Sequence, residues 1–481
     1  MWQAEGVDAA TQFRALLGDE HVLDSSLERT IYSRDGSTVG GACGLVLLPG
    51  TTAEVSACLR LADELGLDVV PRGSGTGLAG GAIPLEDAVV ISVARMARII
   101  DIDAEVPCAW VEPGVLNLDI TNAVKHLGLH YAPDPSSQAA CSIGGNIATN
   151  AGGPHCLASG VTVQHVIGLE WALPDGEIVN LGGLAPDPAG LDLRGFMVGS
   201  EGTLGIATKI CVRLTRNAPA VRTILLDFAR HEDAGACCGA IVAEGVIPAA
   251  LEMMDQMMVQ AVEEFVHADL PVHAAAVLLV EVDGTEAAVA HQARVVAEVA
   301  RAHGVGTVRV AADETERALL WKARKSAFGA VARIAPNYYL HDCVVPRTRL
   351  VEILGRIREI AATQDLSIMN VFHAGDGNLH PLIAFDRRDP EQVERVHAAG
   401  KQIIEACVAV GGVLTGEHGV GLEKRDFMPL TFTAADLDAQ ARARDAIDPD
   451  GRMNPAKVLP LGSRCGEVGL SADSLPEGTW V

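Results

Sequence analysis

Apolar runs and amphipathic stretches alternate along the whole chain, and the intervals between them differ in its two halves. In the first half, apolar runs at 45–48 and 67–70 flank an amphipathic stretch that opens with Thr51-Thr52-Ala53-Glu54. A Thr followed three residues later by Glu is a helix-start signal, so this region predicts a β-α-β unit. Pro174-Asp175-Gly176 separates two further apolar runs and predicts a hairpin turn. The elements predicted in this half are helices at 9–17, 51–65 and 116–127, and strands at 45–48, 67–70, 89–93, 98–103, 108–112, 166–173, 177–181 and from 206 to about 214.

The second half begins after Arg216-Asn217-Ala218-Pro219, where longer helical patterns alternate with strands. This arrangement predicts an α+β domain with helices on one side of a mostly antiparallel sheet. We expect a first domain over 1–216, a second over 217–430, a helical segment over 431–460 that returns to the first domain, and a loosely ordered tail over 461–481. The elements predicted here are strands near 222–228, 275–282, 307–311 and on both sides of 373–380, and helices near 231–244, 285–303, 313–332, 347–363, 390–409 and 434–446.

The densest glycine run of the chain is Pro71–Gly81, with five glycines in eleven residues. Gly75, Gly77 and Gly80 spell G-x-G-x-x-G, the pattern of dinucleotide-binding turns, which requires a helix that opens within the loop. Instead, the loop is followed by Ile83-Pro84 and a strand-like run. The glycines therefore predict a nest of backbone N–H groups for a phosphate, and not a nicotinamide-binding turn.

Two more runs of small residues follow, Cys141–Gly153 and Gly199–Ile206. Small side chains let a flat ligand lie close to the backbone, whose N–H groups then meet its polar ring atoms. Tight packing of a helix on a sheet is the structural alternative for these runs.

Charge and composition narrow the class of partner. The 481 residues carry 62 acidic against 37 basic side chains, a net charge of −25, which repels nucleic acid. No apolar run approaches the roughly 20 residues that cross a bilayer, and the first residues lack the pattern of a secretory signal. We expect a cytoplasmic protein that reaches the inner membrane only through partners. The eleven cysteines form no C-x-x-C pair, which argues against an iron–sulfur cluster or a structural zinc site in this chain.

Histidines and acids gather in two glycine-bounded segments of the second half. His373 and His380 flank Gly375-Asp376-Gly377, a turn that can bring both imidazoles to one point, and Glu417 and His418 stand together in a separate loop. Two imidazoles and a carboxylate, here His373, His380 and Glu417, suit a divalent metal such as Zn²⁺, Mn²⁺ or Fe²⁺. Each residue alone is more often structural. Taken by themselves, the three also fit a metal-dependent hydrolase, which leaves the glycine runs unexplained.

Together, the three glycine-rich runs resemble the FAD-binding domain of the vanillyl-alcohol oxidase flavoprotein family. Asn370–Leu382 and Leu414–Gly421 resemble the 2-hydroxyacid dehydrogenase branch of that family, of the glycolate oxidase type, and the likeness extends from about residue 40 to 460. The resemblance implies an α+β architecture in which a vanillyl-alcohol-oxidase-type FAD-binding domain is followed by an α+β substrate (cap) domain.

The resemblance also implies where FAD binds. The first glycine run would hold the pyrophosphate, the second would lie along the isoalloxazine ring, and the third would line the ribityl and adenosine side. Some members attach FAD through a histidine of the first run, which has none here, so we expect non-covalent FAD; His155 is a weak candidate for a covalent link. The residues implied in FAD binding are Pro71, Arg72, Gly73, Ser74, Gly75, Thr76, Gly77, Pro135, Ser136, Ser142, Gly144, Gly145, Asn146, Thr149, Gly152, Gly153, Glu201, Gly202 and Ile206.

The implied reaction is the oxidation of a small 2-hydroxy acid, glycolate or D-lactate, to the 2-keto acid. It would combine metal-assisted deprotonation with hydride transfer to flavin N5, with His418 as the base and Arg324 binding the substrate carboxylate. Relatives that accept dicarboxylates carry more polar groups where this chain has Leu340 and Leu382. This difference favours a monocarboxylate, with a D-2-hydroxyglutarate dehydrogenase-like enzyme as the alternative.

Reduced flavin must pass its electrons on, and this chain has no cluster motif to receive them. Because the glycolate oxidases of this branch work in multi-subunit assemblies, we expect an iron–sulfur partner subunit. An assembly subunit that keeps flavin only for structure is the remaining alternative.

Overall fold

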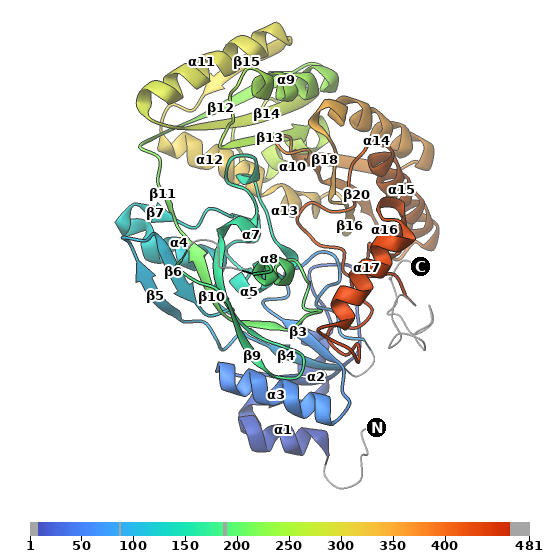
Figure 1. Cartoon of the computed structure of the whole chain (residues 1–481). Coiled ribbons are helices and arrows are strands. Elements are labelled where there is room, and N and C mark those ends of the chain that lie inside the picture. Colours follow the sequence, from blue (N-terminus) through green and yellow to red (C-terminus); the bar gives the residue numbers. More distant parts are fainter. Residues whose placement is uncertain (1–7, 86–87, 186–189, 462–481) are drawn as a thin grey trace. The chain divides into compact units, whose positions relative to one another are not determined.

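The computed structural model describes residues 8–85, 88–185 and 190–461, and the chain divides into two compact units (Figure 1). The first unit comprises the residues up to Gly152, Val161–Asn217 and the chain from Glu417 onward. The second comprises the short stretch Gly153–Gly160 and the long stretch Ala218–Gly416. The tail predicted from 461 lies, from residue 462, outside the described residues.

A four-stranded sheet of order β1-β2-β4-β3 lies in the first unit, and β1 is Val22–Leu23. The predicted β-α-β unit is present as β2 (Cys43–Leu47), α3 (Thr52–Glu64) and β3 (Val69–Arg72), but its two strands are not neighbours. Both pair in parallel with β4 (Ala88–Ser92), which lies between them and whose residues are all buried. The helix α1 (Ala9–Leu17) packs on α3.

The second sheet of this unit is antiparallel, with the order β5-β6-β10-β8-β9. The predicted hairpin is confirmed, since β8 and β9 pair in antiparallel register around the Pro-Asp-Gly turn. Trp171 of β8 is buried and donates its indole N–H to the carbonyl of Leu204, at 2.9 Å. The strand bounds are β5 Ile99–Asp103, β6 Cys108–Val111, β8 Val166–Ala172, β9 Ile178–Gly182 and β10 Ile206–Arg213.

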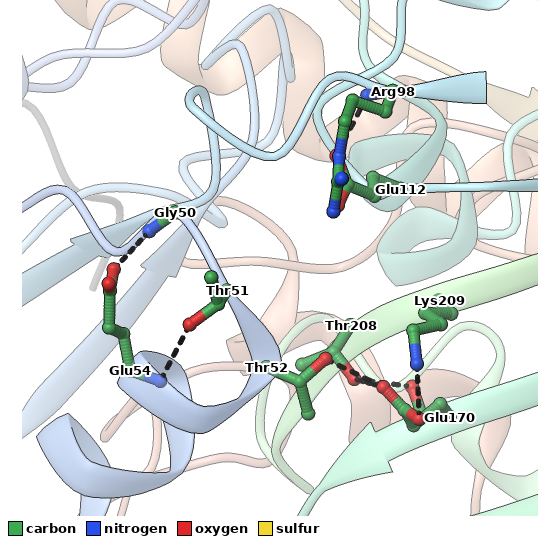
Figure 2. A network of polar contacts seen from close by, with 9 residues as sticks. All are labelled: Gly50, Thr51, Thr52, Glu54, Arg98, Glu112, Glu170, Thr208 and Lys209. Carbon is green, nitrogen blue, oxygen red and sulfur yellow. Dashed lines mark hydrogen bonds and ion pairs between the residues drawn. The ribbon is translucent and has the colours of Figure 1, made fainter. Parts of the chain in front are cut away.

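The start of α3 is tied to the second sheet (Figure 2). Thr51 caps the helix by accepting from the Glu54 N–H, at 3.2 Å, while the Glu54 carboxylate accepts from Gly50, at 2.6 Å, and not from Thr51. The Thr52 hydroxyl donates to Glu170 of β8, at 2.6 Å, and a lysine of β10 binds the same carboxylate. These bonds hold the two sheets of the unit together at the helix N-terminus.

The C-terminal part of the chain belongs to the first unit and extends its parallel sheet. The Val69 N–H donates to Arg452, and the Asn454 N–H donates to Val69, at 2.7 Å. The helix α17 (Ala434–Asp445) supports this segment, because buried Arg444 donates to the carbonyls of Met453, Asn454 and Lys457.

The second unit is built on an antiparallel sheet of order β15-β12-β14-β13-β18-β19-β17, with β20 beside β18 and β16 beside β20 (Figure 1). Helices follow its strands and pack on it and on one another. The strands are β12 Ala220–Phe228, β13 Ala250–Asp255, β14 Ala276–Gly284, β15 Val305–Val310, β16 Asn337–Leu340, β17 Cys343–Val344, β18 Ser367–His373, β19 Asn378–Leu379 and β20 Pro381–Phe385. The helices are α9 His231–Ala243, α10 Gln256–Val266, α11 Glu286–Ala302, α12 Glu314–Lys325, α13 Ala327–Val331, α14 Leu350–Gln364 and α15 Pro390–Ala409.

Two sequence predictions are wrong in this unit. The single helix expected over 313–332 is two helices, because α12 ends at Lys325, Ser326 caps it, and α13 begins at Ala327. The sequence pattern predicts no helix or strand over 245–274, yet this stretch contains β13 and α10. Asp255 joins these two elements, since it ends the strand and accepts the Met258 N–H as the helix cap, at 2.9 Å.

Candidate functional site

The three glycine-rich runs meet inside the first unit. The Ser74 N–H donates to the Ser142 hydroxyl, at 3.3 Å, and a Cβ on Gly73 would lie 2.3 Å from that oxygen. The third run joins them, because the Glu201 N–H donates to Ala148, at 2.8 Å, and a Cβ on Gly202 would lie 3.1 Å from Pro71. The glycines at 73 and 202 leave the space that Ser142 and Pro71 need at these contacts.

A buried cation lies against the first glycine run. The guanidinium of Arg72 lies over the Tyr32 ring, 5.3 Å from its centroid, and donates to the carbonyl of Arg34, at 2.7 Å. A Cβ on Gly75, whose φ is +71°, would meet the same guanidinium at 2.1 Å. Burial lowers the pKa of Arg72, an effect that Asp35 opposes. A guanidinium beside a glycine loop suits the two negative charges of a pyrophosphate, so these residues fit the expected dinucleotide.

Other residues expected to bind FAD lie at α5, in the segment before it and at the start of β10. Ser142 caps the helix α5 (Ile143–Thr149) by accepting from Gly145, and Thr149 donates back to the Gly145 carbonyl. Pro135 and Ser136 lie in the turns that lead to α5, and Ile206 is the first residue of β10. Gly152 ends the first stretch of this unit, whereas Gly153 opens the short stretch that belongs to the second unit.

Glu201 connects the third glycine run to the loop that follows His418. It is buried, has a φ of +52°, and its carboxylate accepts from the Val420 and Gly421 N–H groups, each at 2.7 Å. Burial raises the pKa of Glu201, although the two N–H donors act in the opposite direction. Asn454 donates to its carbonyl, at 2.6 Å. Glu201 therefore fixes the position of the segment that carries Glu417 and His418.

Glu201→Gln is expected to lower the free energy of unfolding of the first unit by about 1–3 kcal/mol. The amide presents an NH₂ group to one of two backbone N–H donors, which leaves that buried donor without an acceptor. Thermal unfolding, followed by the release of the flavin, measures the change. Glu64→Gln, at an exposed position of α3, is the control and should unfold as the wild type does. Equal stability of the two variants would contradict this role of Glu201.

A row of polar side chains crosses the sheet of the second unit. Strand register places Thr223 opposite Glu281, Glu252 opposite His373, and His373 opposite Asn378. Glu281 and Leu279, the residue opposite Glu252, are two apart on β14, so all five polar residues share one face. The helix α12 supplies two arginines to this face, because Arg317 binds Glu281 and Arg324 binds Glu252.

Glu252 holds both a predicted metal ligand and the predicted substrate arginine. Its carboxylate lies 2.5 Å from Arg324 Nη2 and 2.8 Å from His373 Nδ1, and all three residues are at most 4% exposed. Burial acts to raise the pKa of Glu252, but Arg324 and His373 outweigh it and lower that pKa. Within the described residues, Arg324 Nε has no hydrogen-bond partner, so this guanidinium retains a donor for a carboxylate.

His380 lies beside His373 and Asp342. The two imidazole rings are perpendicular with centroids 5.1 Å apart, and His380 Nδ1 is 3.9 Å from Asp342 Oδ1. The Thr415 hydroxyl and the Gly416 N–H both donate to Asp342, at 2.5 and 3.1 Å, and the chain then continues directly into Glu417 and His418. The residues that could hold a metal here are Asp342, His380, Glu417 and His418.

This donor set fits the expected divalent metal, since imidazole and carboxylate suit zinc, manganese and iron. Of the three ligands predicted from the sequence, His380 and Glu417 belong to the group, and His373 lies next to His380. Sequence reasoning missed Asp342 and Glu252 as site residues. Glu252 carried a signal, because it is an acid inside a mostly apolar strand, whereas Asp342 lies between two strands and carried none.

Family models match most of the chain. Residues 44–182 match the model of the FAD binding domain, and residues 218–458 match that of the C-terminal domain of FAD linked oxidases. The chain belongs to the FAD-linked oxidases. It is therefore an FAD-dependent oxidoreductase, and FAD is confirmed as its expected cofactor.

Named relatives of this FAD-linked oxidase act on small hydroxy acids. The glycolate oxidase subunit GlcD of Escherichia coli K12 is 46% identical over 88% of this chain and 85% of the relative. GlcD of Bacillus subtilis is 39% identical over 95% of this chain and 98% of the relative. A probable mitochondrial D-lactate dehydrogenase of Danio rerio is 32% identical over 94% of this chain and 91% of the relative.

Solved structures confirm the fold class of this FAD-linked oxidase. A 4-ethylphenol oxidase from Gulosibacter chungangensis superposes with a TM-score of 0.78 at 19% identity, over 94% of this chain and 97% of the other. A p-cresol methylhydroxylase superposes with a TM-score of 0.77 at 18% identity, over 94% of this chain and 96% of the other.

In residues 8–85, 88–185 and 190–461, no helix has the length and apolar character that a membrane crossing requires.

Proposed function

We propose that this FAD-linked oxidase converts a small 2-hydroxy acid, glycolate or D-lactate, to the 2-keto acid. The observation that carries the proposal is the buried group of Arg324, Glu252 and His373, with His380 and Asp342 beside it. A 2-hydroxy acid carries a carboxylate next to a hydroxyl group. An arginine with an unused N–H donor suits the carboxylate, and a neighbouring set of metal-type ligands suits the hydroxyl group. The names of the glycolate- and D-lactate-oxidising relatives support the same substrate class.

Arg324 would bind the substrate carboxylate through its planar fork, and His418 would accept the hydroxyl proton. Bound FAD, which we expect to be non-covalent, supplies the acceptor for the two electrons and the α-hydrogen. His373, His380 and Glu417, with Asp342 beside them, would hold a divalent ion, which would supply a Lewis acid for the substrate hydroxyl group. Glu417 lies 3.8 Å from His418 Nε2 and helps to orient that imidazole.

The two leucines at positions where relatives that accept dicarboxylates carry polar groups favour a monocarboxylate. Leu340 of β16 and Leu382 of β20 are buried and directly opposite each other in the register. An apolar pair offers no partner for a second carboxylate, whose burial without one is costly. D-2-hydroxyglutarate is accordingly the less favoured substrate.

A partner subunit that carries an iron–sulfur centre would take the electrons from the reduced flavin. Two relatives are named as subunits of a glycolate oxidase, which supports an assembly of this kind.

Anaerobic addition of glycolate or D-lactate is expected to bleach the flavin absorbance of the purified protein. D-2-hydroxyglutarate should reduce the flavin about 5–150-fold more slowly, since a missing partner for a buried polar group costs about 1–3 kcal/mol. Stopped-flow absorbance over a panel of 2-hydroxy acids of both chiralities measures these rates.

The other outcomes of the same screen separate the alternatives. Faster reduction by 2-hydroxyglutarate would favour the dicarboxylate enzyme. A flavin that none of the acids reduces would indicate a structural flavin, and a colourless protein that contains zinc would favour the hydrolase.

A further inference from the structure

Glu252 is a single buried carboxylate shared by two side chains that the proposed reaction uses. It lies in the middle of β13, directly opposite His373 in the register, and Arg324 reaches it from α12. Both carboxylate oxygens lie 2.8 Å from His373 Nδ1. Placing a glutamate in the interior of a strand with every side chain buried is costly unless its charge is paired.

The contact decides which nitrogen of His373 carries the hydrogen. An ionised carboxylate can only accept hydrogen bonds, so Nδ1 must donate to Glu252 and the lone pair is on Nε2. A carboxylate behind a histidine in this way fixes the ring orientation and the tautomer that a metal ligand needs.

The second contact fixes the arginine. Arg324 is at the C-terminal end of α12 and 1% exposed, and its ion pair with Glu252 holds one end of the guanidinium. A guanidinium with one fixed edge loses less rotational freedom when a substrate carboxylate binds to the rest of the fork.

We propose that Glu252 is a positioning residue that presents His373 Nε2 for metal binding and holds Arg324 for the substrate carboxylate. This inference rests on the proposed function and names a residue that acts only through those two side chains.

The chain offers a matched control in the neighbouring pair. Glu281 is also a buried strand glutamate on the same face, and Arg317 binds it from the same helix with two bonds of 2.9 Å. Trp321 and Thr223 donate to Glu281 as well, and His155 stacks on Trp321 with ring centroids 5.5 Å apart. Glu281→Gln therefore disturbs an equivalent buried pair that contacts neither His373 nor Arg324 in the described structure.

The test compares Glu252→Gln with Glu281→Gln in the flavin-loaded, full-length protein. Metal affinity is measured by competition between the protein and a chromophoric chelator for Zn²⁺ and for Mn²⁺, a readout independent of turnover. Glu252→Gln should weaken metal binding by about 10–100-fold and raise the half-saturating acid concentration for flavin reduction, whereas Glu281→Gln should bind metal as the wild type does.

Each outcome decides a different point. Unchanged metal affinity in Glu252→Gln overturns the positioning role, and so does an equal loss in both variants. Wild-type protein that binds metal but is reduced by none of the acids refutes the substrate assignment alone, while wild-type protein that the acids reduce but that has no metal affinity overturns the positioning role alone. If Glu252→Gln fails to fold because Arg324 is left without its counter-charge, the double variant Glu252→Gln/Arg324→Gln removes that charge, and its metal affinity should remain reduced.

Discussion

Replacing His418 by glutamine is expected to leave FAD bound and to slow flavin reduction by the substrate about 10²–10⁴-fold, the range of a lost general base. Glutamine keeps a polar side chain of similar length but cannot take the hydroxyl proton near neutral pH. FAD is expected to be held by the glycine runs and not by this imidazole, so the yellow colour should remain. Stopped-flow reduction with glycolate and D-lactate measures the rate.

The control for this variant is His130→Gln in the same unit. His130 is a partly exposed histidine whose Nδ1 lies 2.8 Å from Asn217 Oδ1, and its replacement should leave the reduction rate unchanged. The assignment of the base fails if His418→Gln reduces its flavin at the wild-type rate while metal content is unchanged. A slower rate that returns fully with added metal would place His418 among the ligands instead.

The secondary structure could be predicted where one segment carries the whole signal. The helix at 9–17 has the predicted bounds, because its four buried residues recur at helical spacing and share one face of the helix. The hairpin of β8 and β9 was visible because its Pro-Asp-Gly turn separates two alternating strands. In contrast, the position of β4 between β2 and β3 could not be predicted, because β2 and β4 are both fully buried and a linear pattern does not order the strands in a sheet.

The site could be predicted in its local parts and not in its pairings. The glycine runs and the histidines can be recognised in the sequence alone, and the structure brings the three glycine runs together. Glu252 is separated from His373 by 121 residues, and Glu201 from Val420 by 219. The first pair depends on the register between two strands, and the second depends on the C-terminal segment packing in the first unit. No short segment of the sequence determines either. An acid inside an apolar strand is the one sequence signal that would have drawn attention to Glu252.

Replacing His380 by asparagine is expected to remove the bound metal and to abolish flavin reduction. His380 is 1% exposed and lies next to both His373 and Asp342, so its imidazole is the central nitrogen donor of the candidate metal group. Removing a direct ligand should weaken metal binding by more than the ~10–100-fold that is typical when a residue bonded to a ligand is replaced. Metal analysis of the purified variant and stopped-flow reduction give the two readouts.

Chelator-stripped wild-type protein should share this defect and regain reduction when Zn²⁺, Mn²⁺ or Fe²⁺ is added, because its ligands are intact. His380→Asn should not recover at metal concentrations that saturate the wild type. His303→Asn is the control, since this histidine of the second unit bonds only the carbonyl of Val299 in the described structure, at 2.8 Å. If the stripped wild type is reduced at its full rate, the hydroxyl proton leaves without a metal, and the polar group around His380 then serves to orient the substrate and not to bind an ion.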